Sequence, residues 1–386
     1  MFQGVVLGGL GLAAGAAAAA AAVGRAAGRK VVMPSAARTL RLHDASELEV
    51  ILPRTEDTLR PGRFGIWRSP DDHVIIGDVL SVTDGLVRRA VVERFGSPLS
   101  KGDTVELRRD LYKDPGEFGV DFSAVEMKTD LGPAPAWLVE GTAIRPWVLH
   151  LHGIRTERRV VLPGVQVATK LGMTSLIPSW RGDSEGPSYP GNASTLGQDE
   201  SIDVGAAIDY AMRHGAPGVI LVGWSLGGTI ALRLAESRRR SDVQGLVLIA
   251  PVSDWRSVIR RGARSANLPA WVGDLTCWML GSRLGHRLVG TPAAVEVSEL
   301  DWTLGSSVTV PLRVIHNPAD QLVPLELSRM LVDAHEGSVL DVFSPAPHAM
   351  EANTEPGRFE QTIERWLAAP LSYEGTSTPD PTGSTK

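Results

Sequence analysis

The sequence predicts an α/β fold with a mostly parallel central sheet and helices on both of its faces. Three observations support this prediction. The branched apolar run at residues 219–222 is typical of a buried strand, and a glycine turn and a helical pattern through Ala235 follow it. Strand and helix candidates alternate from residue 122 onward. Polar residues follow several of these strands, at the edge where parallel sheets place their ligand sites.

The other elements follow from the same patterns. Each expected strand is a short apolar run bounded by turn-forming residues, and each expected helix has apolar residues at helical spacing. Acidic residues in the first turn of the 199–214 segment and Gly215 after it match the preferred ends of a helix. Further strands are expected at 136–139, 147–151, 174–178, 245–250, 310–316 and 339–343, and further helices at 199–214, 324–335 and 356–369.

The composition excludes several classes of function. A net charge of −5 over 386 residues leaves no electrostatic footprint for nucleic acid. Cys277 is the only cysteine, so no disulfide can form within the chain. No cysteine and histidine cluster has metal-ligand spacing, and no phosphate-binding loop of the G-x-x-x-x-G-K-S/T type is present. The sequence therefore predicts no cofactor, no metal and no nucleic-acid partner.

The turn after residues 219–222 carries the candidate nucleophile. Gly223-Trp224-Ser225-Leu226-Gly227 has the G-x-S-x-G pattern between a strand and a helix, which is the context that a nucleophile elbow requires. A glycine two residues on either side of Ser225 lets strand and helix approach each other. Ser225 is therefore expected at the carboxyl edge of the sheet, although a glycine-rich turn with an incidental serine has the same pattern.

Two further polar residues follow later strands and are expected at the same edge. Asp320 comes after the strand at 310–316, and His348 comes after the strand at 339–343. A serine hydroxyl is a weak nucleophile until a histidine takes its proton, and a carboxylate then holds the histidine tautomer and stabilises the imidazolium. We expect Ser225, His348 and Asp320 to act in these roles, with Asp254 as the alternative acid.

An oxyanion hole needs two backbone N–H groups near the serine. One is expected from Leu226, which directly follows the nucleophile, and the other from Ile154 in the loop after His152-Gly153. In that loop Arg155 either contacts a substrate carboxylate or phosphate or lies solvated.

A second loop at the same edge contains Arg181-Gly182-Asp183. We expect Arg181 and Asp183 to hold this loop by an ion pair.

Together these motifs resemble the α/β-hydrolase superfamily, and within it the prolyl-oligopeptidase-like and acyl-esterase serine hydrolases. The resemblance covers residues 130–370 and implies that Ser225, Asp320 and His348 form the catalytic triad. The sequence departs from the usual family pattern at Asn317 and Pro347, where glycine is common. The motifs that carry the resemblance are Gly223-Trp224-Ser225-Leu226-Gly227-Gly228, His152-Gly153, residues 181–186, residues 320–324 and Pro347-His348.

Four regions are expected along the chain. Residues 1–24 form a hydrophobic N-terminal segment, 39–132 a β-rich accessory region, 133–370 the α/β-hydrolase catalytic domain and 371–386 a disordered tail. Within the catalytic domain, residues 255–302 interrupt the alternation and resemble a cap over the active site, or else pack as an extra helix pair. Its apolar residues would favour an acyl or aromatic substrate group: Leu268, Trp271, Leu275, Trp278, Met279 and Leu280.

The N-terminal segment carries no side-chain charge through Gly24, and Arg25, Arg29 and Lys30 follow at once. This asymmetry predicts a membrane tether through residues 5–23, a single-pass transmembrane helix with the catalytic domain on the cytoplasmic side. A cleaved signal peptide of a secreted protein or an alanine-rich leader of a cytoplasmic protein are the alternatives.

The sequence thus predicts a serine hydrolase that cleaves a carboxylic ester through an acyl-enzyme. A serine peptidase or amidase of the prolyl-oligopeptidase-like type is the first alternative. A non-catalytic binding or scaffold protein that retains the fold is the second. The expected partner is a small acyl ester or peptide substrate.

Overall fold

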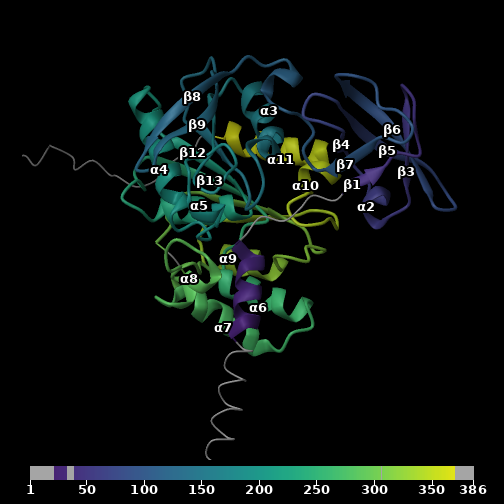
Figure 1. The fold of residues 1–386 in the computed structure, drawn as a ribbon. Helices are drawn as coiled ribbons and strands as arrows, with labels where there is room; N and C mark the ends of the chain where they lie inside the picture. The colour runs from purple at the N-terminus through teal and green to yellow at the C-terminus, as the bar shows by residue number, and fades with distance from the viewer. Residues whose placement is uncertain (1–20, 33–38, 306, 370–386) are drawn as a thin grey trace, which may run out of the picture.

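The computed structural model describes residues 21–32, 39–305 and 307–369, which contain two β-sheets (Figure 1). A seven-stranded sheet has the order β1-β7-β4-β5-β6-β3-β2, and an eight-stranded sheet has the order β15-β14-β13-β12-β10-β11-β9-β8. The seven strands of the first sheet precede the eight strands of the second along the chain.

The eight-stranded sheet has the predicted α/β topology. The strands β10 to β15 are mutually parallel where they pair, while β8 and β9 are antiparallel to their neighbours. The central strand β12 is buried along its whole length. The strands are β8 Ser123–Thr129, β9 Gly132–Val139, β10 Trp147–Leu151, β11 Ser175–Pro178, β12 Val219–Trp224, β13 Val243–Ile249, β14 Leu312–His316 and β15 Val339–Val342.

Helices cover both faces of this sheet. Successive side chains of a strand point to opposite faces, so each strand contributes to the cores on both sides. Leu221 packs in the core that holds α4 Glu200–Arg213, α5 Leu226–Ala235 and α9 Leu325–Asp333. Val222 packs in the other core, with α3 Leu162–Lys170 and α11 Pro356–Ala368. The predicted α/β-hydrolase fold is confirmed, although the sequence patterns missed α3 and β8.

The seven-stranded sheet is antiparallel and has a core of its own. The side chain of Asn353, in α10 Glu351–Thr354, donates hydrogen bonds of 2.8 Å to the carbonyls of Arg63 and Arg109, and so ties this sheet to the hydrolase domain. Its elements are β1 Thr39–Arg41, β2 Asp44–Ala45, β3 Glu49–Pro53, α2 Glu56–Leu59, β4 Phe64–Trp67, β5 His73–Thr83, β6 Leu86–Phe95 and β7 Thr104–Arg108, and η1 Pro115–Phe118 follows it.

The boundary between the two sheets lies earlier in the chain than the sequence patterns place it. The expected boundary at 132/133 falls inside the β8–β9 hairpin, where Thr129 is opposite Gly132. Because β8 is a strand of the larger sheet, we draw the boundary before residue 123.

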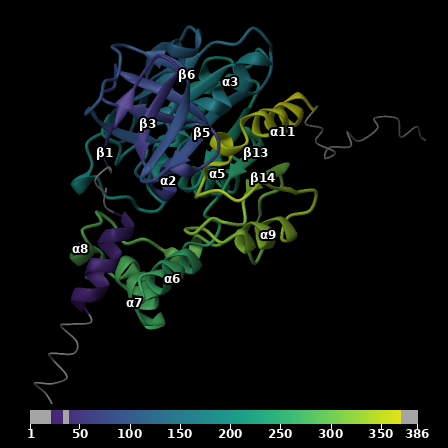
Figure 2. The same cartoon turned by 90° about the vertical axis from the view of Figure 1, so that its right-hand side faces the viewer.

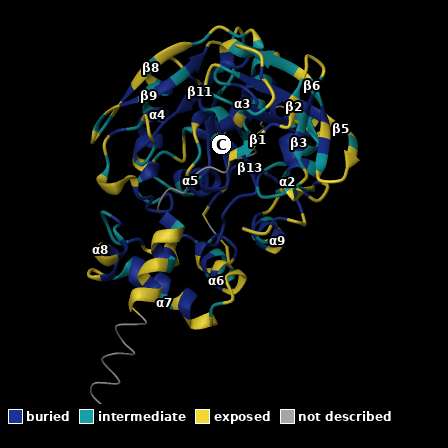
Figure 3. Cartoon of the chain, turned by 45° about the vertical axis from the view of Figure 1, so that its right-hand side comes forward, coloured by how far each residue is buried: buried dark blue, intermediate teal, exposed yellow. Residues whose placement is uncertain are grey.

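A helical layer lies at the carboxyl edge of the larger sheet, apart from the other helices (Figure 2). It consists of α6 Trp255–Ser265, α7 Ala270–Gly281, α8 Gly285–Val289 and η4 Val297–Glu299, which we call the cap. Its helices carry both buried and exposed residues (Figure 3). Two of its tryptophans, Trp271 and Trp278, are 51% and 65% exposed, so they face away from the interior.

Residues 21–32 form a helix that packs beside the cap. The side chain of Arg25 donates to the carbonyl of Leu288 at 2.9 Å, and a Cβ on Gly28 would come within 2.8 Å of the Val289 side chain. Residues 1–20 lie outside the described residues, and with them most of the predicted tether at 5–23. None of the helices within the described ranges has the length and apolar character needed to cross a membrane. The predicted tail at 371–386 also lies outside the described residues.

Candidate active site

The turn between β12 and α5 holds Ser225 in a backbone conformation that non-glycine residues rarely adopt, with φ 53° and ψ −110°. The N–H of Ser225 donates to the carbonyl of Ile249 at 2.9 Å, which fixes the turn against β13. A Cβ on Gly223 would lie 2.4 Å from the carbonyl oxygen of Gly227, and one on Gly227 would lie 2.2 Å from that of Leu151. Both glycines of the G-x-S-x-G pattern are therefore required by close backbone approach.

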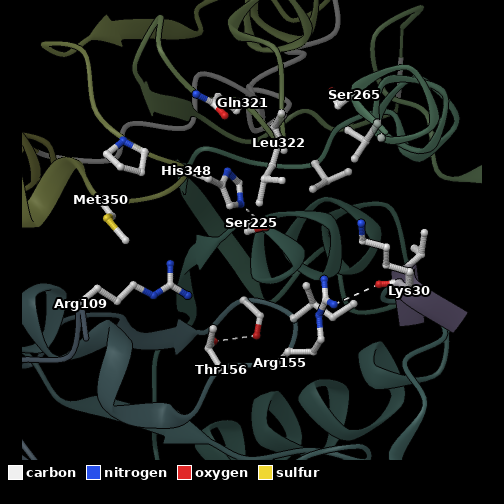
Figure 4. A pocket seen from close by; sticks show the side chains of 18 of the residues that line it. Lys30, Arg109, Arg155, Thr156, Ser225, Ser265, Gln321, Leu322, His348 and Met350 are labelled. Atoms are coloured by element: carbon white, nitrogen blue, oxygen red, sulfur yellow. Dashed lines mark hydrogen bonds between the residues drawn. The ribbon is translucent and has the colours of Figure 1, made fainter. Parts of the chain in front are cut away.

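A continuous hydrogen-bonded chain joins the serine to the two residues expected beside it, and Figure 4 shows its first two members, Ser225 and His348. His348 Nε2 lies 2.7 Å from Ser225 Oγ, and His348 Nδ1 lies 2.6 Å from Asp320 Oδ2. His348 comes from the loop after β15, and Ala349 behind it has a φ of 55° that turns this loop toward the sheet edge. The structure thus brings Ser225, His348 and Asp320 together.

Asp320 is only 3% exposed, yet each of its oxygens accepts two hydrogen bonds. Oδ1 accepts from the backbone N–H groups of Leu322 and Val323 at 2.8 and 2.9 Å, and Oδ2 lies 3.0 Å from His316 Nε2 and 2.6 Å from His348 Nδ1. Burial alone would raise the pKa of Asp320, but the hydrogen bonds to the two histidines outweigh it and hold this pKa well below its usual value. The carboxylate therefore stays ionised beside the imidazole of His348.

The alternative acid, Asp254, lies elsewhere in the structure. It caps the N-terminus of α6, where its Oδ1 accepts from the backbone N–H of Ser257 at 3.1 Å. His316 is a further member of the site that no motif predicted, and its other ring nitrogen, Nδ1, lies 2.7 Å from Ser328 Oγ. Its position at the end of β14, four residues before Asp320, is the signal that could have found it.

The two expected oxyanion donors flank the serine. Neither the Leu226 N–H nor the Ile154 N–H donates to another described residue. Leu226 is the first residue of α5, where backbone N–H groups have no partner within the helix. A Cβ on Gly153 would lie 3.4 Å from Ser225 Cβ, so the turn that contains Ile154 lies directly against the serine.

His152 holds the loop that contains Ile154 in place. The predicted ion pair between Arg181 and Asp183 is wrong. The ring of His152 stacks on Trp180 at 3.7 Å, and its Nε2 lies 3.0 Å from Asp183 Oδ2. Arg181 instead pairs with Asp203 of α4, with hydrogen bonds of 2.9 and 2.7 Å. Asp183 is turned toward its own loop, where its carboxylate also accepts from the N–H of Trp180.

A cavity of about 1340 Å³ lies above Ser225 and has three walls of different origin. Of the apolar cap residues expected here, Leu268 lines the cavity, whereas Trp271 and Trp278 do not. No sequence motif assigned the residues of the other two walls to the site. The lining residues include Val252, Trp255, Val258, Ile259 and Leu268 from the cap side, Ala27, Lys30 and Val31 from the N-terminal helix, and Thr55, Asp57, Arg60, Arg108 and Arg109 from the β-rich region.

The described residues contain no group of three or more His, Cys, Asp or Glu side chains that could hold a metal ion. The contacts among Ser225, His348 and Asp320 have the geometry of a serine, a histidine base and an acid that orients it.

Comparison with known proteins shows the family to which the chain belongs. The model of the alpha/beta hydrolase family matches residues 148–360, more than half of the chain, and residues 38–108 match a domain of unknown function. The chain therefore belongs to the alpha/beta hydrolase family, and we identify the protein as a hydrolase of that superfamily. No curated protein matches the sequence.

Solved structures are similar to this chain at low sequence identity. An esterase from Pyrococcus furiosus is 19% identical, with a TM-score of 0.51 over 66% of this chain and 94% of that one. A hydrolase from Pseudomonas aeruginosa is 19% identical, with a TM-score of 0.48 over 64% and 99%. Alpha/beta hydrolase domain-containing protein 10 from mouse is 20% identical, with a TM-score of 0.49 over 64% and 98%. At these identities the similarity concerns the fold.

Proposed function

We propose that the protein is a serine hydrolase that cleaves carboxylic esters through an acyl-enzyme. The hydrogen-bonded chain from Ser225 through His348 to Asp320, beneath a cavity of about 1340 Å³, carries the proposal. The residues that would do the chemistry come from three loops at one sheet edge, where ligands of parallel sheets bind.

In the proposed reaction, Ser225 Oγ attacks the ester carbonyl carbon while His348 Nε2 takes its proton. Asp320, already ionised, stabilises the imidazolium through Nδ1. The N–H groups of Leu226 and Ile154 hold the negative oxygen of the tetrahedral intermediate. His348 then gives its proton to the departing alcohol, and a water that it activates in turn releases the acid and restores the serine.

The apolar cap wall favours an ester with a hydrocarbon acyl group. Trp255, Val258 and Ile259 present aliphatic and aromatic surface to the cavity, and such surface binds apolar groups through the area that it removes from water. The similar fold from Pyrococcus furiosus is that of an esterase, which is consistent with this substrate class.

The proposal is tested with p-nitrophenyl esters of two to twelve carbons and with aminoacyl p-nitroanilides, on wild type and on Ser225→Ala. We expect ester cleavage by wild type with a clear chain-length optimum, slower cleavage of anilides, and no activity in the variant. Faster cleavage of the anilides would mean a peptidase. A folded wild type that is inactive on every substrate would mean a binding or scaffold protein.

The membrane tether at residues 5–23 stays a prediction. In fractionated cells we expect the full-length chain in the membrane pellet after an alkaline carbonate wash. Recovery of the full-length chain in the supernatant would contradict it.

A further inference from the structure

Arg109 reaches the cavity from the β-rich region, directly after β7. Figure 4 shows its guanidinium directed toward the middle of the pocket, with Lys30 across the cavity from it. A Cβ placed on Gly153 would lie 3.7 Å from Arg109 Nη2 and 3.4 Å from Ser225 Cβ. The guanidinium and the nucleophile therefore lie within 4 Å of one common point, beside the turn expected to hold the oxyanion.

The guanidinium of Arg109 has no hydrogen bond or ion pair with any residue that the structure describes, although the side chain is partly buried. Other arginines of the cavity are paired: Arg60 with Asp57 at 2.5 Å, and Arg108 with Glu106 through a hydrogen bond of 2.6 Å. Burial lowers the pKa of Arg109, and nearby Asp110 and Glu351 oppose this effect. An arginine remains protonated in proteins, so the cavity contains an unpaired cation.

The two carboxyl groups whose charges act on Arg109, those of Asp110 and Glu351, have other contacts. Asp110 Oδ2 lies 4.0 Å from Arg159 Nε, and Glu351 Oε1 accepts from the amide of Asn317 at 2.7 Å. The backbone of Arg109 is itself fixed, because its carbonyl accepts from the Asn353 side chain at 2.8 Å. A cation that is held in place, partly removed from water and unpaired favours binding of an anion from outside the chain.

We propose that Arg109 binds a carboxylate of the substrate, so that the enzyme prefers esters with a carboxylate a few bonds from the scissile carbonyl. The planar guanidinium matches a carboxylate with two parallel hydrogen bonds. The cap wall then receives the apolar part of the same molecule, on the other side of Ser225. This assignment rests on the proposed role of Ser225 as nucleophile, and it gives the β-rich region a part in substrate choice.

The test compares two matched pairs of esters on wild type, Arg109→Met and Arg109→Lys. p-Nitrophenyl hemisuccinate is paired with p-nitrophenyl pentanoate, which places the carboxylate on the acyl side. 3-Carboxy-4-nitrophenyl butyrate is paired with p-nitrophenyl butyrate, which places it on the alcohol side. Lys101→Met is the control, because it removes an exposed cation of the β-rich region that does not line the cavity.

We expect Arg109→Met to lower kcat/KM by about tenfold or more for at least one carboxylate ester and to leave its neutral partner within about threefold. Arg109→Lys should restore part of the loss, since the charge remains but the planar fork does not. Lys101→Met should leave the ratio within each pair unchanged. Equal loss on charged and neutral esters in Arg109→Met, or a preference that persists in it, would overturn the proposal.

Binding separates this proposal from the proposed reaction. N-Benzylsuccinamate carries a carboxylate and an amide in place of the ester, and its affinity can be measured by calorimetry on Ser225→Ala. We expect the Ser225→Ala/Arg109→Met double variant to bind it at least about tenfold more weakly. Equal affinity would overturn the role of Arg109 even if wild type hydrolyses esters, and the expected loss would support it even if wild type hydrolyses none.

Discussion

The floor and the walls of the cavity are built in different ways. The floor contains Ser225 and His348, with Asp320 buried behind them; the three come from loops after β12, β15 and β14 and are joined by short hydrogen bonds. The walls include residues of the cap, residues 27–31 and residues of the β-rich region, which lie outside the larger sheet, together with loops that follow β10, β13 and β14. In the proposed function, the floor supplies the groups for chemistry and the walls supply groups for substrate choice.

The largest expected effect comes from the floor. Ser225→Ala should lower kcat by about 10⁴ or more, because the attacking atom is removed while the cavity remains. The turn keeps its strained backbone conformation with φ at 53°, so the free energy of unfolding should stay near that of wild type. Ester hydrolysis and urea unfolding on the same preparation check both parts. Residual activity within about tenfold of wild type would remove Ser225 from the role of nucleophile.

The next effect distinguishes two aspartates, one on the floor and one at the cap. Asp320→Asn should lower kcat by about 10⁴, since an amide cannot hold His348 in the tautomer that accepts the serine proton. Asp254→Asn, at the N-cap of α6, should leave kcat within about tenfold, because asparagine also caps helices. Rates on one p-nitrophenyl ester decide it, and a reversed order of the two losses would return Asp254 to the role of acid.

A buried acid behind the floor predicts a pH effect on stability. Burial raises the pKa of Glu351 to about 7 from its ordinary value of 4.5, although the hydrogen bond from Asn317 opposes this. The folded state then binds the proton more tightly than the unfolded one. The contribution of protonated Glu351 to the free energy of unfolding is therefore complete below pH 4.5 and is lost as the pH rises through about 7.

Between pH 5 and pH 8 this group should remove up to about 3 kcal/mol from the free energy of unfolding, and Glu351→Gln should remove most of that dependence. Urea unfolding at both pH values measures it. Glu56→Gln in the β-rich wall is the control, because its side chain is 85% exposed and should give the wild-type difference. An unchanged pH dependence in Glu351→Gln would contradict the account.

The smallest effect compares two glycines. Gly227→Ala would place a methyl 2.2 Å from the carbonyl of Leu151, so it should lower the free energy of unfolding by about 1–3 kcal/mol. Gly262→Ala, inside α6 of the cap, meets no atom within 4 Å and should raise it by about 0.5–1 kcal/mol. Urea unfolding checks the sign of each change, and equal changes would remove the contrast between floor and wall.

The same contrast explains which parts the sequence could predict. Ser225, Asp320 and His348 each follow a recognisable strand, and parallel strands bring their carboxyl ends to one edge, so their meeting follows from local patterns. The contacts of Arg109 and Arg181 could not be predicted in this way. Arg181 pairs with Asp203 rather than with Asp183, which is nearer in the sequence. Arg109 reaches the site only because one sheet packs against the other. Such contacts depend on tertiary structure, which no short stretch of sequence encodes.

The central claim is that Ser225 is the activated nucleophile of this fold. Incubation of the full-length protein with a fluorophosphonate, followed by peptide mass mapping, tests it directly. The account predicts one adduct per chain, on Ser225, and a much slower reaction in His348→Ala. An adduct on another residue, or a folded protein that the reagent does not modify, would contradict it.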